Sequence, residues 1–181
     1  MGFRIAYLLA QTDLSVATSA FGLTETALTN EQPDADTALW ATHLVKTGWT
    51  VMWAEDELFF HDQPKRIAAL SQHGPVISCI VNETVMAATA MGWRNGALTW
   101  SVHHQGDGED TAHLDATGAL PPLFDDLKAR AQANADDEFD TYYPYFEIPL
   151  DLAAMETGFR HDRVLLPTEA PTFHTLAAAP A

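Results

Sequence analysis

Three histidines and several carboxylates gather near the end of the most regular apolar stretch of this chain. His103 and His104 are adjacent, and His113 follows after an acidic segment that contains two glycines. Adjacent residues of a strand point to opposite faces, so only His104 is expected to meet His113 if the chain returns as a hairpin. With Asp115 these side chains would offer Zn²⁺ two imidazoles and a carboxylate. Because the spacing matches no established metal motif, the sequence favours a solvated acidic loop without a cofactor, with a divalent-metal site at His104, His113 and Asp115 as the alternative.

A second candidate site is the acidic and aromatic run DDEFDTYYPYFE at residues 136–147. Aromatic rings provide contact area, and carboxylates pair with Arg and Lys, so this combination suits a basic protein partner. In the alternative interpretation, alternate rings belong to the core and the acids form a solvated rim. The candidate partner-binding residues are Asp136, Asp137, Glu138, Phe139, Asp140, Tyr142, Tyr143 and Tyr145.

A third candidate depends on the dipeptide Asn95-Gly96, which lies between two apolar-rich runs. This pair favours a type I′ turn, and the turn sets the strand register. Met91 would then face Trp100 on a bulky face that belongs to the core. The other face carries small side chains, so either a helix packs closely there or a ligand approaches the backbone. The residues of this candidate ligand groove are Ala90, Gly92, Thr99, Ser101 and His103.

The segment Gly158-Phe159-Arg160-His161-Asp162 offers a histidine beside a carboxylate. Adjacent residues seldom orient each other as a catalytic base requires, and no Ser or Cys stands in a recognisable nucleophile motif. We interpret the segment as a helix stop followed by a polar turn. No catalytic residue is assigned, and the absence of the common phosphate, dinucleotide and zinc-protease motifs argues against an enzyme without excluding one.

Composition and charge narrow the function classes further. The chain has 181 residues and a formal charge of −16, and residues 107–151 hold twelve acidic side chains against Lys128 and Arg130. Such a field repels nucleic acid and membrane surfaces and favours basic partners. No apolar run has the length of a transmembrane helix, so we expect a cytoplasmic protein. Cys79 is the only cysteine and is expected to be a buried structural thiol.

Apolar periodicity and turn signals predict an α+β fold. We expect an antiparallel, meander-containing sheet with helices packed mainly on one face. Residues 1–166 would form one domain, and 167–181 would be a flexible C-terminal tail. The expected strands are residues 3–10, 49–54, 58–61, 76–81, 85–93, 97–104, 112–116, 142–148 and 159–166. The expected helices are residues 13–21, 34 or 36 to 47, 64–72, 123–134 and 150–157, with a polar turn at 24–33.

Short pieces spread over most of residues 3–162 resemble a group of uncharacterised small bacterial proteins. The resemblance implies a bacterial, single-domain protein, and it transfers no catalytic residue because that group has no established activity. The pieces are Gly48-Trp49, Val85-Met86, Trp93-Arg94-Asn95-Gly96, Trp100-Ser101-Val102-His103, Gly118 with Pro121, Glu147-Ile148-Pro149 and Gly158-Phe159-Arg160-His161-Asp162.

Three functional hypotheses follow from the sequence. The first is a non-enzymatic acidic protein that binds a basic protein, as an immunity or regulatory protein would. The second is a metal-dependent enzyme or metal-binding protein that uses the His104 and His113 site, with Zn²⁺ as the cofactor. The third is a protein that binds a small molecule against the face of the sheet that carries small side chains.

Overall fold

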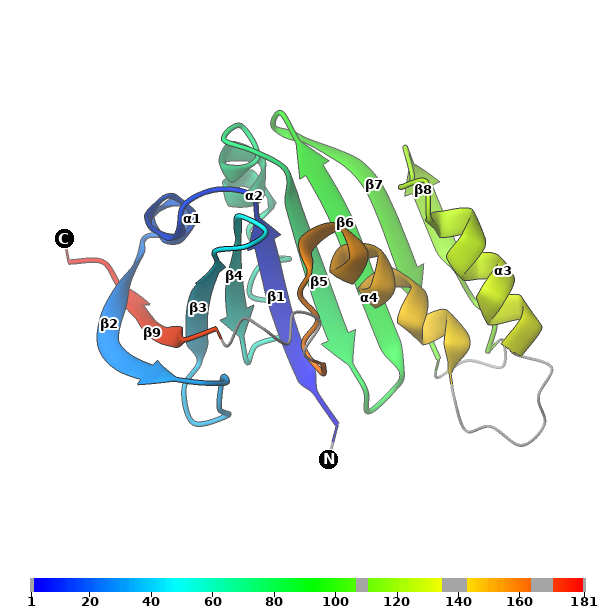
Figure 1. Ribbon diagram of the computed structural model, residues 1–181, viewed down its shortest axis with the longest axis horizontal. Coiled ribbons are helices and arrows are strands. Elements are labelled where there is room, and N and C mark those ends of the chain that lie inside the picture. The colour runs from blue at the N-terminus through cyan, green and yellow to red at the C-terminus, as the bar shows by residue number, and fades with distance from the viewer. Residues whose placement is uncertain (1, 107–110, 135–142, 164–170, 181) are drawn as a thin grey trace.

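The computed structural model describes residues 2–106, 111–134, 143–163 and 171–180. These residues form one antiparallel sheet with helices packed on it (Figure 1). The spatial order of its strands is β2-β9-β3-β4-β1-β5-β6-β7-β8, and every neighbouring pair is antiparallel. Strands β5 to β8 form a meander, which confirms the predicted α+β fold with an antiparallel, meander-containing sheet, whereas the helices, predicted mainly on one face, cover both faces. The strands are β1 (Arg4–Ala10), β2 (Leu23–Asn30), β3 (Leu39–Leu44), β4 (Trp49–Ala54), β5 (Val76–Asn82), β6 (Ala87–Arg94), β7 (Ala97–His104), β8 (Asp115–Gly118) and β9 (Phe173–Ala178).

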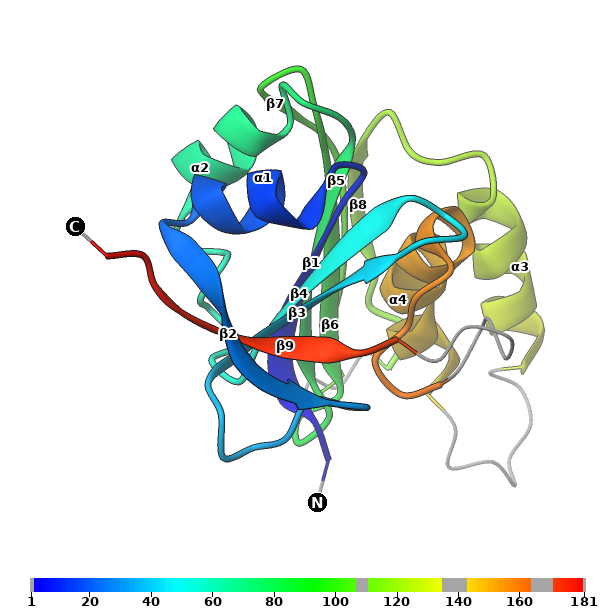
Figure 2. The ribbon, with the colours of Figure 1, turned by 60° about the vertical axis from the view of Figure 1, so that its left-hand side comes forward.

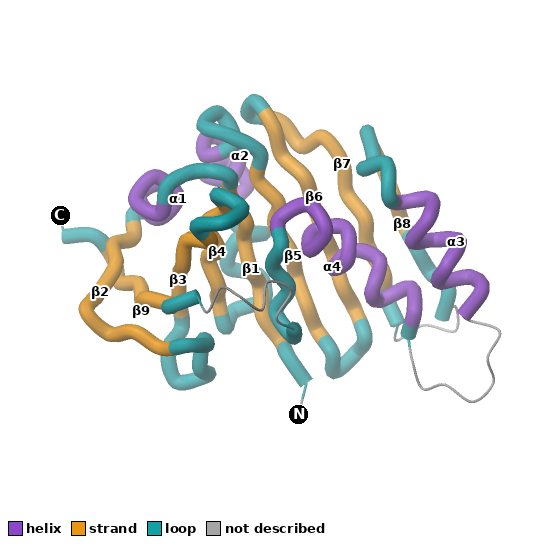
Figure 3. Tube along the Cα trace, viewed as in Figure 1, coloured by secondary structure: helices purple, strands orange, loops and turns teal. Residues whose placement is uncertain are grey.

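The helices lie in two layers on opposite sides of the sheet (Figures 2 and 3). The two longer helices, α3 (Phe124–Asn134) and α4 (Pro144–Thr157), pack together on one side, with α4 over β5, β6 and β7. The short helices α1 (Leu14–Ala20) and α2 (Pro64–Leu70) lie on the other side. Each side therefore has its own apolar core, and β1 contributes alternate residues to both. No helix in the described part of the chain is long and apolar enough to span a membrane.

The hairpin between β6 and β7 confirms the predicted turn but not the predicted register. Asn95 and Gly96 both have positive φ, as a type I′ turn requires. Trp93 pairs with Leu98 as expected, but a bulge then shifts the register so that Gly92 pairs with Trp100. Because one residue of shift moves side chains to the other face, Trp100 points towards α4 and lies across Gly92, where no side chain competes with the indole.

Several elements differ from the sequence-based expectations, among them the strand expected at 58–61, which is a series of turns. The predicted helix ending at residue 47 is strand β3, because pairing with β4 along its whole length outweighs a helical spacing of apolar residues. The predicted polar turn at 24–33 contains the edge strand β2, whose exposed threonines hide the usual apolar alternation. The strand predicted at 142–148 is the first part of α4, where Pro144 occupies the first helical turn.

The C-terminal residues also depart from the prediction of a flexible tail. Residues 173–178 form β9, which lies between β2 and β3 inside the sheet and buries Phe173 and Leu176. The segment is short and rich in alanine, so it has no strong strand signal of its own. Two flanking strands supply its hydrogen-bond partners, and this tertiary context decides its structure.

Candidate functional site

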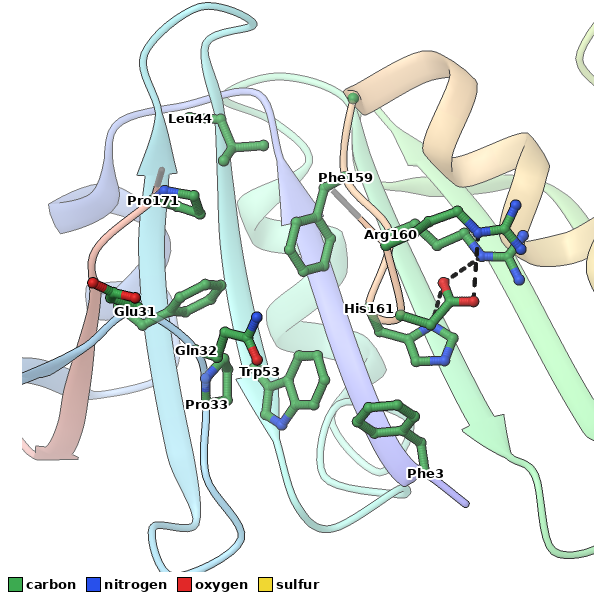
Figure 4. Close-up of a pocket in the computed structure, with 14 residues that line it drawn as sticks. Phe3, Glu31, Gln32, Pro33, Leu44, Trp53, Phe159, Arg160, His161 and Pro171 are labelled. Carbon is green, nitrogen blue, oxygen red and sulfur yellow. Dashed lines mark hydrogen bonds and ion pairs between the residues drawn. The ribbon is translucent and has the colours of Figure 1, made fainter. Parts of the chain in front are cut away.

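A pocket of about 280 Å³ opens beside the C-terminal end of α4, on the side of the sheet that α3 and α4 cover (Figure 4). Its floor comes from β3, β4 and β9, and its walls come from the N-terminal residues and the segment after α4. We call it the aromatic pocket. Its apolar lining consists of Phe3, Pro33, Leu44, Trp53, Phe159, Pro171 and Phe173, and its polar lining includes Glu31, Gln32, Arg160, His161, Asp162 and Arg163.

The aromatic side chains form a connected wall. Phe3 meets Trp53 edge to face with ring centroids 5.9 Å apart, and Phe159 lies 6.3 Å from Phe173. These rings come from four separate segments of the chain. The indole Nε1 of Trp53 donates a hydrogen bond to Glu55 at 2.7 Å, which fixes the ring orientation. The pocket thus presents preoriented aromatic surface to a bound group.

A buried charge cluster supports the side of the pocket next to α4. The guanidinium of Arg160 is nearly inaccessible and contacts Glu147, Asp151 and Asp162 at 2.5–2.7 Å. Glu147 and Asp151 are one helical turn apart on α4, so they reach the same point. Burial alone would lower the pKa of Arg160, but the three carboxylates raise it above its usual value. Arg160 therefore stays charged and ties the segment after α4 to the helix.

His161 lies between this cluster and the aromatic side chains, with its Nδ1 3.9 Å from Oδ1 of Asp162. Its ring is fully buried, stacks on Tyr7 at 5.9 Å and meets Phe3 edge to face at 5.0 Å. Nε2 lies 3.4 Å from Glu83, whose other oxygen accepts a hydrogen bond from the backbone N–H of Phe3. Burial lowers the pKa of His161, against the opposing effects of Asp162 and Glu83. At neutral pH the imidazole is therefore uncharged and links β1 to the segment after α4.

Below His161, Tyr7 and Cys79 are direct partners on β1 and β5. Both are fully buried, and burial raises the pKa of the Cys79 thiol to about 12. Burial likewise raises the pKa of Tyr7 well above its usual value. Neither side chain ionises near neutral pH, so the pair forms a neutral floor beneath the histidine. The structure bears out the prediction that Cys79 is a buried thiol.

Only two of the three residues of the predicted metal site come together, since His113 Nε2 lies 3.3 Å from Asp115 while His104 is on the other face of the sheet. His104 is fully buried on the side of α4, where its ring contacts Phe146 and its Nδ1 lies 2.7 Å from the carbonyl oxygen of His113. Asp115 pairs with His103 across β7 and β8, so it lies on the opposite face of the sheet from His104. Within the described residues, no group of three or more His, Cys, Asp or Glu side chains is arranged to hold a metal ion.

The predicted ligand groove is divided between two faces of the sheet. Ala90 and Gly92 lie beneath α4 and Trp100, so the alternative of a closely packed helix is correct for them. The bulge places Ser101 and His103 on the other face, where His103 hydrogen-bonds with Thr89. Thr99 is the extra residue of the bulge and donates to the Gly92 carbonyl. The expectation of a groove on the face with small side chains was wrong, because the register it assumed ends at the bulge.

Most of the predicted partner-binding run lies outside the described residues, namely Asp136, Asp137, Glu138, Phe139, Asp140 and Tyr142. Tyr143 is exposed directly before α4. Tyr145 is buried in α4 and belongs to the core, as the alternative interpretation of alternate rings expected.

Sequence reasoning did not recognise residues 158–163 as the wall of a pocket. The helix stop was correct, since Gly158 adopts the left-handed conformation and donates to the carbonyl of Ala154. The polar turn was an incomplete description, because both side chains are buried: Arg160 contacts Glu147 and Asp151 of α4, and His161 contacts the distant Glu83. The only local signal was the run Arg160-His161-Asp162, in which an imidazole stands between a guanidinium and a carboxylate.

No protein-family model matches the chain, and comparisons with curated proteins and with solved structures also give no match.

Proposed function

We propose that this protein binds a small organic molecule in the aromatic pocket. The observation that supports the proposal most is the composition of the wall, in which aromatic rings from distant segments surround one cavity beside a few fixed polar groups. Ligand sites typically combine a mainly apolar lining with a small number of oriented polar side chains. The volume suits a ligand of fragment size, such as one aromatic ring with a short polar substituent.

The way in which the wall is supported strengthens the proposal. A helix stop alone would not require an arginine with three carboxylate partners, and burying these charges costs free energy unless every partner is well placed. The cluster around Arg160 holds the segment 158–163 in one position, and His161 connects it to Glu83 and β1. A preoriented site loses less conformational entropy when a ligand binds.

Two-dimensional ¹H–¹⁵N NMR with a neutral probe, benzyl alcohol, tests this function. We expect millimolar binding that shifts the indole N–H of Trp53 and the amides of residues 158–163. The variant Gln32→Trp places a large ring on an exposed lining residue and should abolish these shifts. Leu28→Trp adds the same ring on an exposed position of β2 outside the pocket and should leave them unchanged. The absence of shifts in the wild-type protein, or shifts that persist in Gln32→Trp, would argue against this function.

A second candidate function is binding of a basic protein through the acidic surface. The charge of −16, with twelve acidic residues between 107 and 151, supports it. Arg160 and Arg163 neutralise part of this charge, because they pair with Glu147 and Asp151, and the other carboxylates of the segment still outnumber Lys128 and Arg130.

A pull-down from lysate at low and at high salt tests the second candidate. A specific basic partner should be retained at physiological ionic strength, weaken at high salt, and be lost on replacing the exposed Tyr143 with Ala. Met155 is also exposed and lies near the other end of α4 from Tyr143. Replacing Met155 with Ala therefore provides a control on the same helix. Retention that is equal for both variants, or no retained protein at any salt concentration, would contradict this candidate.

A further inference from the structure

We infer that the ligand of the aromatic pocket is an organic cation, a molecule with an apolar body and a positively charged nitrogen. This inference rests on the proposed function and adds the chemical class of the ligand. It depends on two independent properties of the pocket, which are the aromatic wall and the sign of the charge around it.

The aromatic wall suits a cation because ring faces carry negative electrostatic potential. A cation within about 6 Å of a ring centroid is attracted to the ring, most strongly for an indole. Trp53 provides the indole, and Phe3 and Phe159 provide rings on either side of it (Figure 4). Trp53 also donates its N–H to the carboxylate of Glu55, which increases the electron density of the indole and adds a negative charge at its edge.

The fixed charges around the pocket sum to a negative value. Arg160 and Arg163 are the cations of the lining, and three carboxylates pair with them, those of Glu147, Asp151 and Asp162. Figure 4 shows that the side chain of Arg160 extends away from the pocket. The cluster therefore carries an excess of one negative charge and offers no uncompensated guanidinium to an anion.

Two further groups determine what a ligand meets inside the pocket. Burial lowers the pKa of His161, so its imidazole adds no positive charge at neutral pH. Glu31 lies in the lining, and its carboxylate has no ion-pair partner within the described residues. A ligand cation would give this carboxylate a partner, whereas an anion would be repelled by it and by the overall charge of −16.

Calorimetric titration with three probes that share a benzyl group tests the inference. The probes are benzyltrimethylammonium, benzyl alcohol and phenylacetate, which are cationic, neutral and anionic. We expect the cation to bind at least about tenfold more tightly than the alcohol, and phenylacetate to bind more weakly than both. Glu31→Gln should weaken binding of the cation about threefold and leave the alcohol unchanged. Asp62→Asn removes an equal charge at an exposed position outside the pocket and should change neither probe.

The outcomes separate this inference from the proposed function. If benzyl alcohol or phenylacetate binds as tightly as the cation, and Gln32→Trp abolishes that binding, the inference is overturned while the proposed function stands. If Asp62→Asn weakens the cation as much as Glu31→Gln does, the attraction is only the field of the whole protein and the inference is overturned as well. If none of the probes binds, the proposed function fails together with the inference.

Discussion

Arg160 and Asp162 are two residues apart, and the guanidinium Nε of Arg160 donates a hydrogen bond to Asp162 Oδ1 at 2.7 Å. This contact closes a tight turn in which residues 160 and 163 form a bridge, and the intervening His161 has its Nδ1 3.9 Å from the same oxygen while its ring packs against Tyr7 and Phe3. One side of the turn thus joins the charge cluster on α4, and the other side joins the aromatic pocket. The position of the pocket wall therefore depends on the ion pairs of Arg160.

The first prediction concerns the stability that this cluster provides. Arg160→Met should lower the free energy of unfolding by about 2–4 kcal/mol, because it leaves the partly buried carboxylates of Glu147 and Asp151 beside a neutral side chain. Urea denaturation at neutral pH measures this change. Arg4→Met breaks an exposed ion pair with Glu57 and should cost far less, because solvent screens this pair. Equal effects of the two substitutions would show that the cluster around Arg160 does not stabilise the fold in this way.

The second prediction concerns pH. Because the pKa of His161 is lower in the folded protein than in the unfolded chain, the unfolded chain takes up the proton first as the pH falls below about 6.5. The folded state should therefore lose stability between pH 7.5 and 5.0. Burial opposes ionisation of Asp162, but Arg160, His161 and Arg163 together lower the pKa of this carboxyl, so it stays ionised over the same range.

Denaturation of His161→Gln at both pH values isolates this effect. The difference in unfolding free energy between the wild-type protein and the variant should be smaller at pH 5.0 than at pH 7.5. His73→Gln, at an exposed position after α2, should show no such change. A difference for His161→Gln that stays constant with pH would mean that the imidazole is not held neutral by burial.

The third prediction tests the packing under α4. Gly92→Ala should destabilise the protein by about 1–3 kcal/mol, because the new methyl group would overlap the Trp100 indole. Thermal or urea unfolding measures the cost. In a Trp100→Leu background the same substitution should cost clearly less, since the indole is gone. A cost that is the same in both backgrounds would contradict the observed register of β6 and β7.

The fourth prediction tests the C-terminal strand. Leu176→Ala should destabilise the protein by about 2–5 kcal/mol, because this side chain is buried in β9 within the core under α1 and α2. Leu28→Ala on the exposed side of β2 should change stability by no more than about 0.5 kcal/mol. If Leu176→Ala is as neutral as its control, residues 173–178 are the mobile tail that the sequence predicts.

The sequence predicts those parts of the fold whose signals are local. The apolar spacing was sufficient to predict α2 and α3, and the Asn95-Gly96 pair was sufficient to predict the turn, because neighbouring residues determine each of these structures. Strands β3 and β9 were missed because their structure depends on pairing with distant partners. The prediction of a ligand groove was wrong for a related reason, since the bulge at Gly92 changes which side chains share a face.

The aromatic pocket could not have been predicted from local patterns. Phe3, Trp53, Phe159 and Phe173 carry no common spacing and meet only through the order of strands in the sheet. The segment after α4 contributes Arg160 and His161 to the site, but two partners of Arg160 lie in α4, and Glu83, the partner of His161, follows β5. Spatial proximity of this kind is a property of the fold.

A crystal structure of the protein grown with benzyltrimethylammonium would test the central claim most directly. We predict electron density for the probe in the aromatic pocket, with its nitrogen within about 6 Å of the Trp53 ring centroid and facing Glu31. An empty aromatic pocket at a probe concentration that saturates the protein in solution, with the probe seated elsewhere, would contradict the claim.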